Sequence, residues 1–127
     1  MTTPSTPATA ASTSGFITVQ SLTKKFGPNT ALDDVSLSLG KGETMAIIGP
    51  SAAGKSVLLK CIVGLHGADS GKIMLGGDDV SQVSSPARKH WAERIGMLFQ
   101  QNALFDSMKV WENICFRQIE RGTMTRK

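Results

Sequence analysis

The sequence lacks any apolar run long enough to cross a bilayer. Its 127 residues are 40% hydrophobic, yet no stretch of eighteen consecutive apolar residues occurs. It also lacks a basic start followed by an apolar segment, which argues against a secretory signal. We therefore expect no direct membrane span in these residues, and one domain at most, with enough apolar residues for a core.

Cysteine is scarce, and its placement argues against a metal site. Cys61 and Cys115 lie far apart, form no C-x-x-C pair, and have no zinc-like spacing with His66 and His90. Cys61 lies inside an apolar run, which predicts a buried free thiol. We interpret the chain as one from a reducing, cytosolic compartment.

Concentrated charge is also missing. The net charge is +4, and the densest basic spots, Lys24-Lys25 and residues 88–90, are short. A basic balance raises the expectation of nucleic acid or an anionic membrane surface, but charge spread in this way is typical of a solvated surface. We expect no nucleic-acid partner.

The first fifteen residues lack the composition of a folded segment. After Met1, residues 2–14 are only Thr, Ser, Pro and Ala, which cannot bury enough apolar surface to offset their ordering entropy. We predict a disordered tail over 1–15 and an organised region over 16–127.

The pattern of the organised region predicts an α/β fold. Residues 16–20 and 31–39 have strand character and flank a turn at 26–29. The run 44–48 is apolar without alternation, which is typical of a strand buried on both faces in a parallel sheet. Residues 71–75 and 79–80 predict a hairpin around 76–78, and 95–99 predict another strand.

Three helices are also predicted. One covers 57–63 and ends at Gly64. A second covers 86–94, with Ser84 or Ser85 as its cap and a proline just inside. The third covers 110–119.

One eight-residue segment carries recognisable chemistry. Residues 49–56, Gly-Pro-Ser-Ala-Ala-Gly-Lys-Ser, match G-x-x-x-x-G-K-[S/T] at every fixed position. They stand between the expected strand 44–48 and the helix after it, as a P-loop requires. The alternative, a glycine-rich turn kept for packing alone, does not account for the full match in that context.

Each residue type in this motif has a physical role. Backbone N–H groups of the loop, and the positive end of the following helix, bind phosphate oxygens. Lys55 places a positive charge near the outer phosphates, and Ser56 offers a hydroxyl to Mg²⁺. We predict ATP and Mg²⁺ as ligands of a site comprising Gly49, Pro50, Ser51, Ala52, Ala53, Gly54, Lys55, Ser56 and Val57. If Ala52 or Ala53 needs a positive φ, alanine there costs on the order of 1 kcal/mol relative to glycine.

The motifs around this loop resemble those of ATP-binding cassette (ABC) transporter ATPases. The resemblance runs over about residues 16–118 and includes 31–43 before the P-loop, 71–80, and a segment over 97–114 that is similar to the family's Q-loop region. It implies an incomplete ABC ATPase domain, namely a P-loop NTPase with a RecA-like core and an N-terminal antiparallel β subdomain. It also implies a peripheral place on the cytoplasmic face of the inner membrane.

The resemblance assigns roles to two further residues. Phe26 takes the place of the aromatic residue that stacks on adenine, although it could equally be a core phenylalanine. Gln100 matches the Q-loop glutamine, which contacts Mg²⁺ and the attacking water in the family, so we count it with Lys55 as catalytic. The alternative is a solvated residue at a strand end.

The segment 103–114 resembles the surface that docks a transmembrane permease subunit. Ala103, Leu104, Phe105 and Met108 would form its apolar patch, unless they pack internally. Together with Val57, the sequence Ala-Leu-Phe-Asp-Ser-Met with Trp-Glu-Asn is similar to the Mla/Mce branch, which moves phospholipid or related lipid between bacterial membranes. A second ATPase subunit is implied as a dimer partner.

Several family motifs are missing from these 127 residues. No L-S-G-G-Q signature, Walker B strand or following switch histidine occurs. Residues 74–79 end in two aspartates, but Gly76-Gly77 makes them a turn. We therefore expect the chain to be the N-terminal part of an ABC ATPase that hydrolyses ATP poorly alone, since holding Mg²⁺ and positioning water need a carboxylate. Two alternatives remain: a non-catalytic nucleotide-binding or docking fragment, and a soluble P-loop kinase or DNA-associated ATPase.

Overall fold

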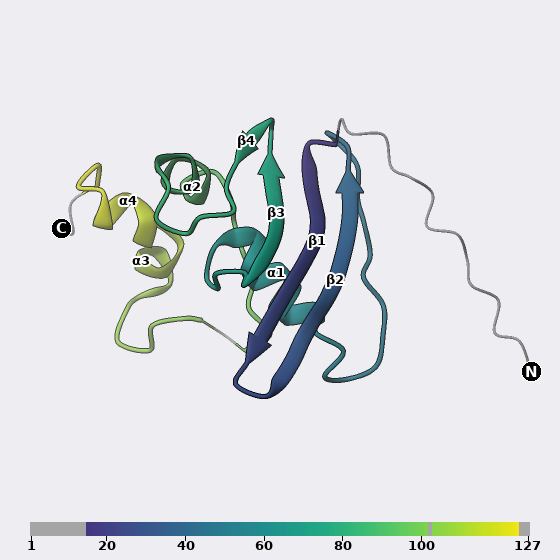
Figure 1. The fold of residues 1–127 in the computed structure, drawn as a ribbon. Coiled ribbons are helices and arrows are strands. Elements are labelled where there is room, and N and C mark those ends of the chain that lie inside the picture. The colour runs from purple at the N-terminus through teal and green to yellow at the C-terminus, as the bar shows by residue number, and fades with distance from the viewer. Residues whose placement is uncertain (1–14, 102, 125–127) are drawn as a thin grey trace, which may run out of the picture. The chain divides into compact units, whose positions relative to one another are not determined.

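The computed structural model describes residues 15–101 and 103–124, and the chain divides into two compact units. Unit 1 ends at Gly96, and unit 2 begins at Met97. Figure 1 labels the elements of both units. The disordered tail predicted over 1–15 falls, apart from Gly15, outside the described residues.

Unit 1 is built on an antiparallel sheet with the strand order β2-β1-β3-β4. The strands are β1 (Ile17–Phe26), β2 (Asn29–Leu39), β3 (Ser70–Leu75) and β4 (Asp78–Asp79). β1 pairs with both β2 and β3, and a two-residue turn joins β1 to β2. The predicted strands at 16–20 and 31–39, the turn at 26–29 and the hairpin over 71–80 are confirmed, and β1 runs on to Phe26.

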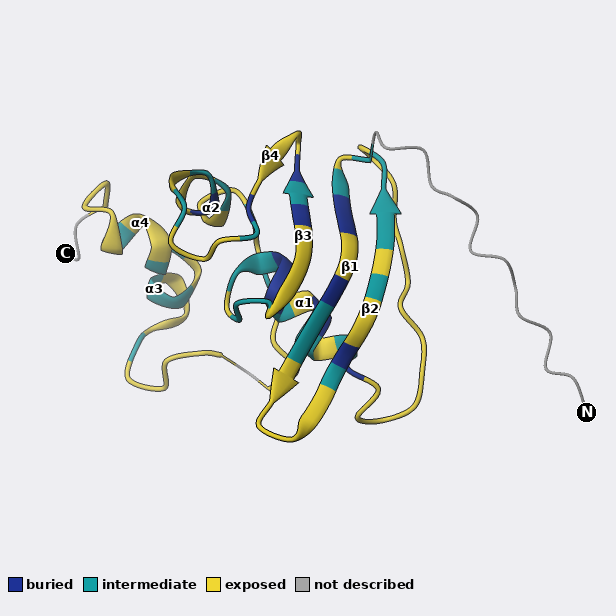
Figure 2. Cartoon of the chain, in the orientation of Figure 1, coloured by how far each residue is buried: buried dark blue, intermediate teal, exposed yellow. Residues whose placement is uncertain are grey.

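The core lies between this sheet and α1 (Lys55–Val63). Figure 2 shows buried positions on β1, β3 and α1. Burying such side chains contributes about 1.5–3 kcal/mol each, so this layer holds unit 1 together. Its apolar members are Val19, Leu22, Leu32, Leu58, Cys61, Ile62, Ile73, Leu75 and Val80.

The ends of two helices follow from their sequences. α1 ends at Gly64, whose φ of 87° provides the left-handed cap that glycine favours. α2 (Pro86–Ala92) begins after Ser85, whose hydroxyl accepts from the Arg88 N–H at 3.1 Å. Both helices were predicted, although α1 begins two residues earlier than expected and α2 ends two residues earlier.

Two predicted strands are not formed. Residues 44–48 and 95–99 form no helix or strand, and the side chains of Ile48 and Leu98 are 92% and 97% exposed. A strand is stable only when a neighbour accepts and donates its backbone hydrogen bonds. Every strand pair among the described residues is antiparallel, so neither run has the parallel neighbour that its apolar pattern anticipates.

Unit 2 contains α3 (Val110–Ile114) and α4 (Phe116–Glu120) in place of the single helix predicted over 110–119. The break falls at Cys115, which closes α3 and opens α4. The rings of Phe105 and Phe116 lie 4.7 Å apart and hold the preceding loop against α4.

Candidate functional site

The glycine-bounded loop runs directly into the first turn of α1. The Ala53 N–H donates to the Pro50 carbonyl at 3.4 Å, and the Leu58 N–H donates to the Gly54 carbonyl at 2.8 Å. The N–H groups of a helix's first turn have no partner within the helix, and they carry its positive dipole end. Loop and helix therefore present several unpaired donors and a positive potential at one place.

Glycine is required at position 54 because a side chain there would overlap with neighbouring atoms. Its φ is 86°, and an added Cβ would lie 2.3 Å from the Ala31 carbonyl oxygen and 2.9 Å from Leu32 Cδ2. Strand β2 thus lies immediately behind the loop. The close approach fixes where α1 begins, and with it the direction in which the first-turn N–H groups point.

The Lys55 side chain folds back over the loop that precedes it. Its Nζ donates to the Gly49 carbonyl at 2.8 Å and to the Pro50 carbonyl at 2.5 Å. The ammonium is therefore placed at the loop, beside the backbone donors. The side chain of Ser56, in the first turn of α1, is exposed, so its hydroxyl is accessible.

A shallow groove of about 310 Å³ opens over this loop, lined by Ala31 and residues 52–57. The hydrogen-bond donors around the groove are backbone N–H groups, one ammonium and one hydroxyl. This set of donors favours an anionic ligand. No cluster of three His, Cys, Asp or Glu that could hold a metal occurs in the described ranges. Mg²⁺ is commonly bound by one or two protein oxygens together with substrate phosphates, so Ser56 fits such an ion only in company with a phosphate.

The anticipated strain in the loop is present at Ala52. Its φ is 62°, whereas Ala53 is not among the residues with positive φ. We predict that Ala52→Gly raises the free energy of unfolding by about 0.5–1 kcal/mol, because removing the left-handed strain outweighs the extra freedom of the unfolded chain. Ala53→Gly is the matched control and lowers it by a similar amount. Urea denaturation measures both, and equal signs for the two variants would contradict the prediction.

Phe26 stands at the end of β1 and is not a core residue. Its ring is 44% exposed, lies 5.5 Å from the His66 ring, and has Lys24 Nζ 5.2 Å from its centroid. Asp69 holds this corner together, because its carboxylate accepts from the Lys25 N–H at 2.6 Å and from Lys24 Nζ at 3.2 Å. The backbone hydrogen bond, followed by the Lys24 contact, lowers the pKa of Asp69. An exposed, oriented ring is available for stacking.

Gln100 belongs to unit 2, where it is exposed and lies outside any helix or strand. Lys55, Ser56 and the loop belong to unit 1. The role of Gln100 stays a prediction.

The predicted docking segment is largely exposed within unit 2. The exposed fractions of Leu104, Phe105, Val110 and Ile114 are 67%, 45%, 78% and 74%, and a hollow of about 370 Å³ lies among them. Asn113 organises this surface: its Oδ1 accepts from the Phe105 N–H at 2.8 Å, and its Nδ2 donates to the Phe105 and Met108 carbonyls at 3.2 Å. Sequence reasoning missed this bridging asparagine.

Arg88 corrects our interpretation of the basic run 88–90. That run was assigned to a solvated surface, but Arg88 is 4% exposed. Its guanidinium donates to the carbonyls of Cys61 and Ile62 near the end of α1. Burial lowers its pKa, while Cys61, predicted as a buried free thiol, is confirmed as one with a pKa that burial raises.

Comparisons with known proteins agree with the geometry. The sequence model of the family "ABC transporter" matches residues 32–127. The chain is 48% identical over 100 residues to the sulfate/thiosulfate import ATP-binding protein CysA of Burkholderia mallei, covering 79% of this chain and 27% of that protein. It is 41% identical over 107 residues to the protein of the same name from Xanthomonas campestris pv. campestris, covering 84% of this chain and 30% of the relative. The chain thus spans less than a third of the length of these relatives.

Solved structures give the same picture. The dimeric post-hydrolysis state of the ATP-binding cassette MJ0796, bound to ADP and Pi, superposes with a TM-score of 0.74 at 26% identity over 87% of this chain and 50% of that one. A nucleotide-free ATP-binding cassette from an ABC transporter superposes with a TM-score of 0.55 at 36% identity, covering 60% of this chain and 30% of that one. The expected fold class, a P-loop NTPase with an antiparallel N-terminal sheet, is confirmed.

Proposed function

This chain belongs to the ABC transporter family, and from that premise we propose that residues 49–57 bind the phosphates of ATP with Mg²⁺ in the ATP-binding subunit of a transporter. Domains of this family bind ATP with Mg²⁺. The observation that carries the proposal is the geometry of the loop. Gly54, with a φ of 86°, directs unpaired N–H groups toward the groove, and Lys55 Nζ donates to backbone carbonyls beside it. A phosphate oxygen is a stronger acceptor for that ammonium than a neutral carbonyl.

The proposed roles follow from the chemistry of each side chain. Lys55 neutralises the outer phosphates and Ser56 gives one oxygen to Mg²⁺, while the backbone of 49–54 and the Val57 N–H orient the phosphate chain. Phe26 stacks on the base, and Gln100 orients the attacking water through its amide. When bound, Mg²⁺ supplies charge neutralisation between the outer phosphates.

Binding tests this proposal directly. Lys55→Ala is expected to weaken the binding of a fluorescent ATP analogue at least tenfold, since a charge-assisted contact contributes about 1.5–3 kcal/mol. Lys89→Ala, which removes an exposed lysine from α2, is the matched control and leaves affinity unchanged. Equal affinity in the two variants would refute phosphate binding at this loop.

Turnover tests whether these residues already contain a complete catalytic set. We expect these 127 residues to bind ATP but to hydrolyse it no faster than their Lys55→Ala variant, because Lys55, Ser56 and Gln100 bring no carboxylate to hold Mg²⁺ and position water. Phosphate release measured with both proteins provides the check. Turnover well above the variant would show that the catalytic set is already complete. ATP hydrolysis is proposed for the assembled full-length ATPase.

The partners proposed are a transmembrane permease subunit, docked on residues 103–114, and a second ATPase subunit. Exposed apolar side chains around the Asn113-organised loop support the first, and the dimeric neighbour structures support the second. No helix in the described ranges is long and apolar enough to span a membrane. A peripheral place on the cytoplasmic face of the membrane is part of the same proposal.

The cargo is the finer part of the proposal. The names of the relatives do not support lipid transport, since they specify sulfate or thiosulfate import. Our lipid proposal rests on the resemblance of Val57 and residues 103–114 to the Mla/Mce branch, and sulfate import is the second candidate. Disrupting the gene distinguishes them: loss of growth on sulfate as sole sulfur source would refute the lipid cargo, whereas detergent sensitivity with normal growth on sulfate would support it.

A further inference from the structure

A second pocket in unit 1 lies among aromatic and cationic side chains that the nucleotide proposal does not use. It has a volume of about 380 Å³, within the usual range for small-ligand sites, and is lined by Phe16, Ile17, Lys41, Leu75, Trp91, Arg94 and Ile95. None of these residues belongs to the phosphate-binding loop. We propose that this pocket binds a small planar aromatic anion, such as an aromatic carboxylate.

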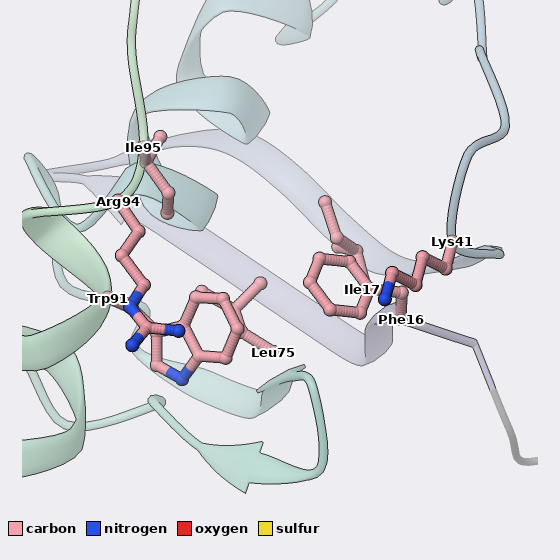
Figure 3. Close-up of a pocket in the computed structure, with 7 residues that line it drawn as sticks. All are labelled: Phe16, Ile17, Lys41, Leu75, Trp91, Arg94 and Ile95. Atoms are coloured by element: carbon pink, nitrogen blue, oxygen red, sulfur yellow. The ribbon is translucent and has the colours of Figure 1, made fainter.

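Two aromatic rings form one wall of the pocket. The rings of Phe16 and Trp91 lie 5.6 Å apart at an interplanar angle of 78°, an edge-to-face pair. Figure 3 shows both rings beside the cavity, with the aliphatic side chain of Leu75 close to the indole. A flat ligand ring can pack against such a corner with its edge on one ring and its face on the other.

The indole is held in place before any ligand arrives. Trp91 Nε1 donates to Asp78 Oδ2 at 2.8 Å. The ring also lies against Gly76, where an added Cβ would come within 2.6 Å of Trp91 Cζ2. A preorganised wall lowers the entropy lost on binding, which favours a small ligand.

Two cations give the pocket its preference for an anion. The Arg94 guanidinium lies over the Trp91 ring at 5.8 Å from the centroid, and Lys41 approaches from a different segment beside Phe16, as Figure 3 shows. Both residues are exposed at the pocket rim. The Asp78 carboxylate accepts from the indole N–H, and the Glu43 carboxylate accepts from the Gly40 N–H. A carboxylate on a flat ring can therefore reach a cation while the ring stays on the aromatic wall.

The end of α2 fixes where Arg94 stands. The N–H groups of Arg94 and Ile95 both donate to the Trp91 carbonyl, at 2.9 and 3.1 Å. Trp91 and Arg94 therefore belong to one hydrogen-bonded turn at the end of α2. Lys41 comes from the exposed connection after β2 and adapts to the ligand.

Calorimetric titration with 2-naphthoate, and with the neutral 2-naphthylmethanol, tests the proposal. We expect 2-naphthoate to bind at least fivefold more tightly than the alcohol, and Arg94→Gln and Lys41→Gln each to weaken it about three- to tenfold, as for an exposed charge-assisted contact. Lys89→Gln, an exposed lysine outside the pocket, removes the same net charge and leaves binding unchanged. Lys55→Ala also leaves it unchanged, which separates this pocket from the nucleotide site.

Three outcomes would overturn the proposal. Equal binding of the alcohol would show an apolar surface without anion preference, and equal loss in Lys89→Gln would show a response to net charge only. A mass that rises with protein concentration and falls on adding 2-naphthoate would assign this face to a second copy of the chain. Circular dichroism of each variant confirms that it is folded, so a weakened affinity reports on the pocket.

Discussion

Gly54→Ala is expected to abolish binding of an ATP analogue and to lower the free energy of unfolding by roughly 2–5 kcal/mol. The φ of 86° costs a side chain about 1–2 kcal/mol, and the overlap of a Cβ with the Ala31 carbonyl adds a further overpacking cost of about 1–3 kcal/mol. Relief requires β2 and the start of α1 to separate. Because the same backbone aims the first-turn N–H groups, affinity and stability fall together.

Gly49→Ala is the control for the stability effect. A Cβ there would meet Ala53 Cβ at 3.7 Å and Lys55 Cδ at 4.0 Å, which are ordinary contacts. We expect its free energy of unfolding to change by less than about 1 kcal/mol. Urea denaturation and titration with the fluorescent analogue measure both variants. A Gly54→Ala protein as stable as Gly49→Ala would show that β2 does not constrain the loop.

Local rules predicted the elements whose stability is decided nearby. The turn between β1 and β2, the glycine end of α1 and the serine cap of α2, predicted at Ser84 or Ser85, depend on residues a few positions apart. The same holds for the strain at Ala52, since φ follows from the loop's own geometry. The fold class followed because the loop motif and its flanking segments occur in one order.

The features that the sequence did not predict depend on partners that are distant in the chain. The runs 44–48 and 95–99 have strand composition, but pairing requires a neighbour that no local pattern specifies. Arg88 looked like a surface residue because its partners, two carbonyls of α1, are 26 and 27 positions away. Likewise the Phe16–Trp91 wall joins residues from opposite ends of unit 1.

Arg88→Met is the second substitution with a large expected effect, a loss of about 3–5 kcal/mol in the free energy of unfolding. The guanidinium is buried and is stabilised by the carbonyls of Cys61 and Ile62, at the negative end of α1. Methionine fills part of the volume but removes the guanidinium donors from both carbonyls, and the Cys61 carbonyl keeps the Gly64 N–H at 3.2 Å. An added Cβ at Gly64 would come within 2.7 Å of Arg88 Cδ, so the side chain also forms the packing surface beneath the helix end.

The matched control for this substitution is Lys89→Met, on the next residue of α2, which is exposed and should change stability by no more than about 0.5 kcal/mol. Arg88→Lys should fall between the two, because one ammonium keeps the charge at the helix end but cannot reach both carbonyls with the planar fork of arginine. Thermal and urea denaturation measure the series.

If Arg88→Met were as stable as Lys89→Met, the guanidinium would be dispensable, and apolar packing between α1 and α2 would have to fix the far end of the phosphate-binding helix. If Arg88→Lys matched the wild type, charge at the helix end, and not the two hydrogen bonds, would be the interaction that matters.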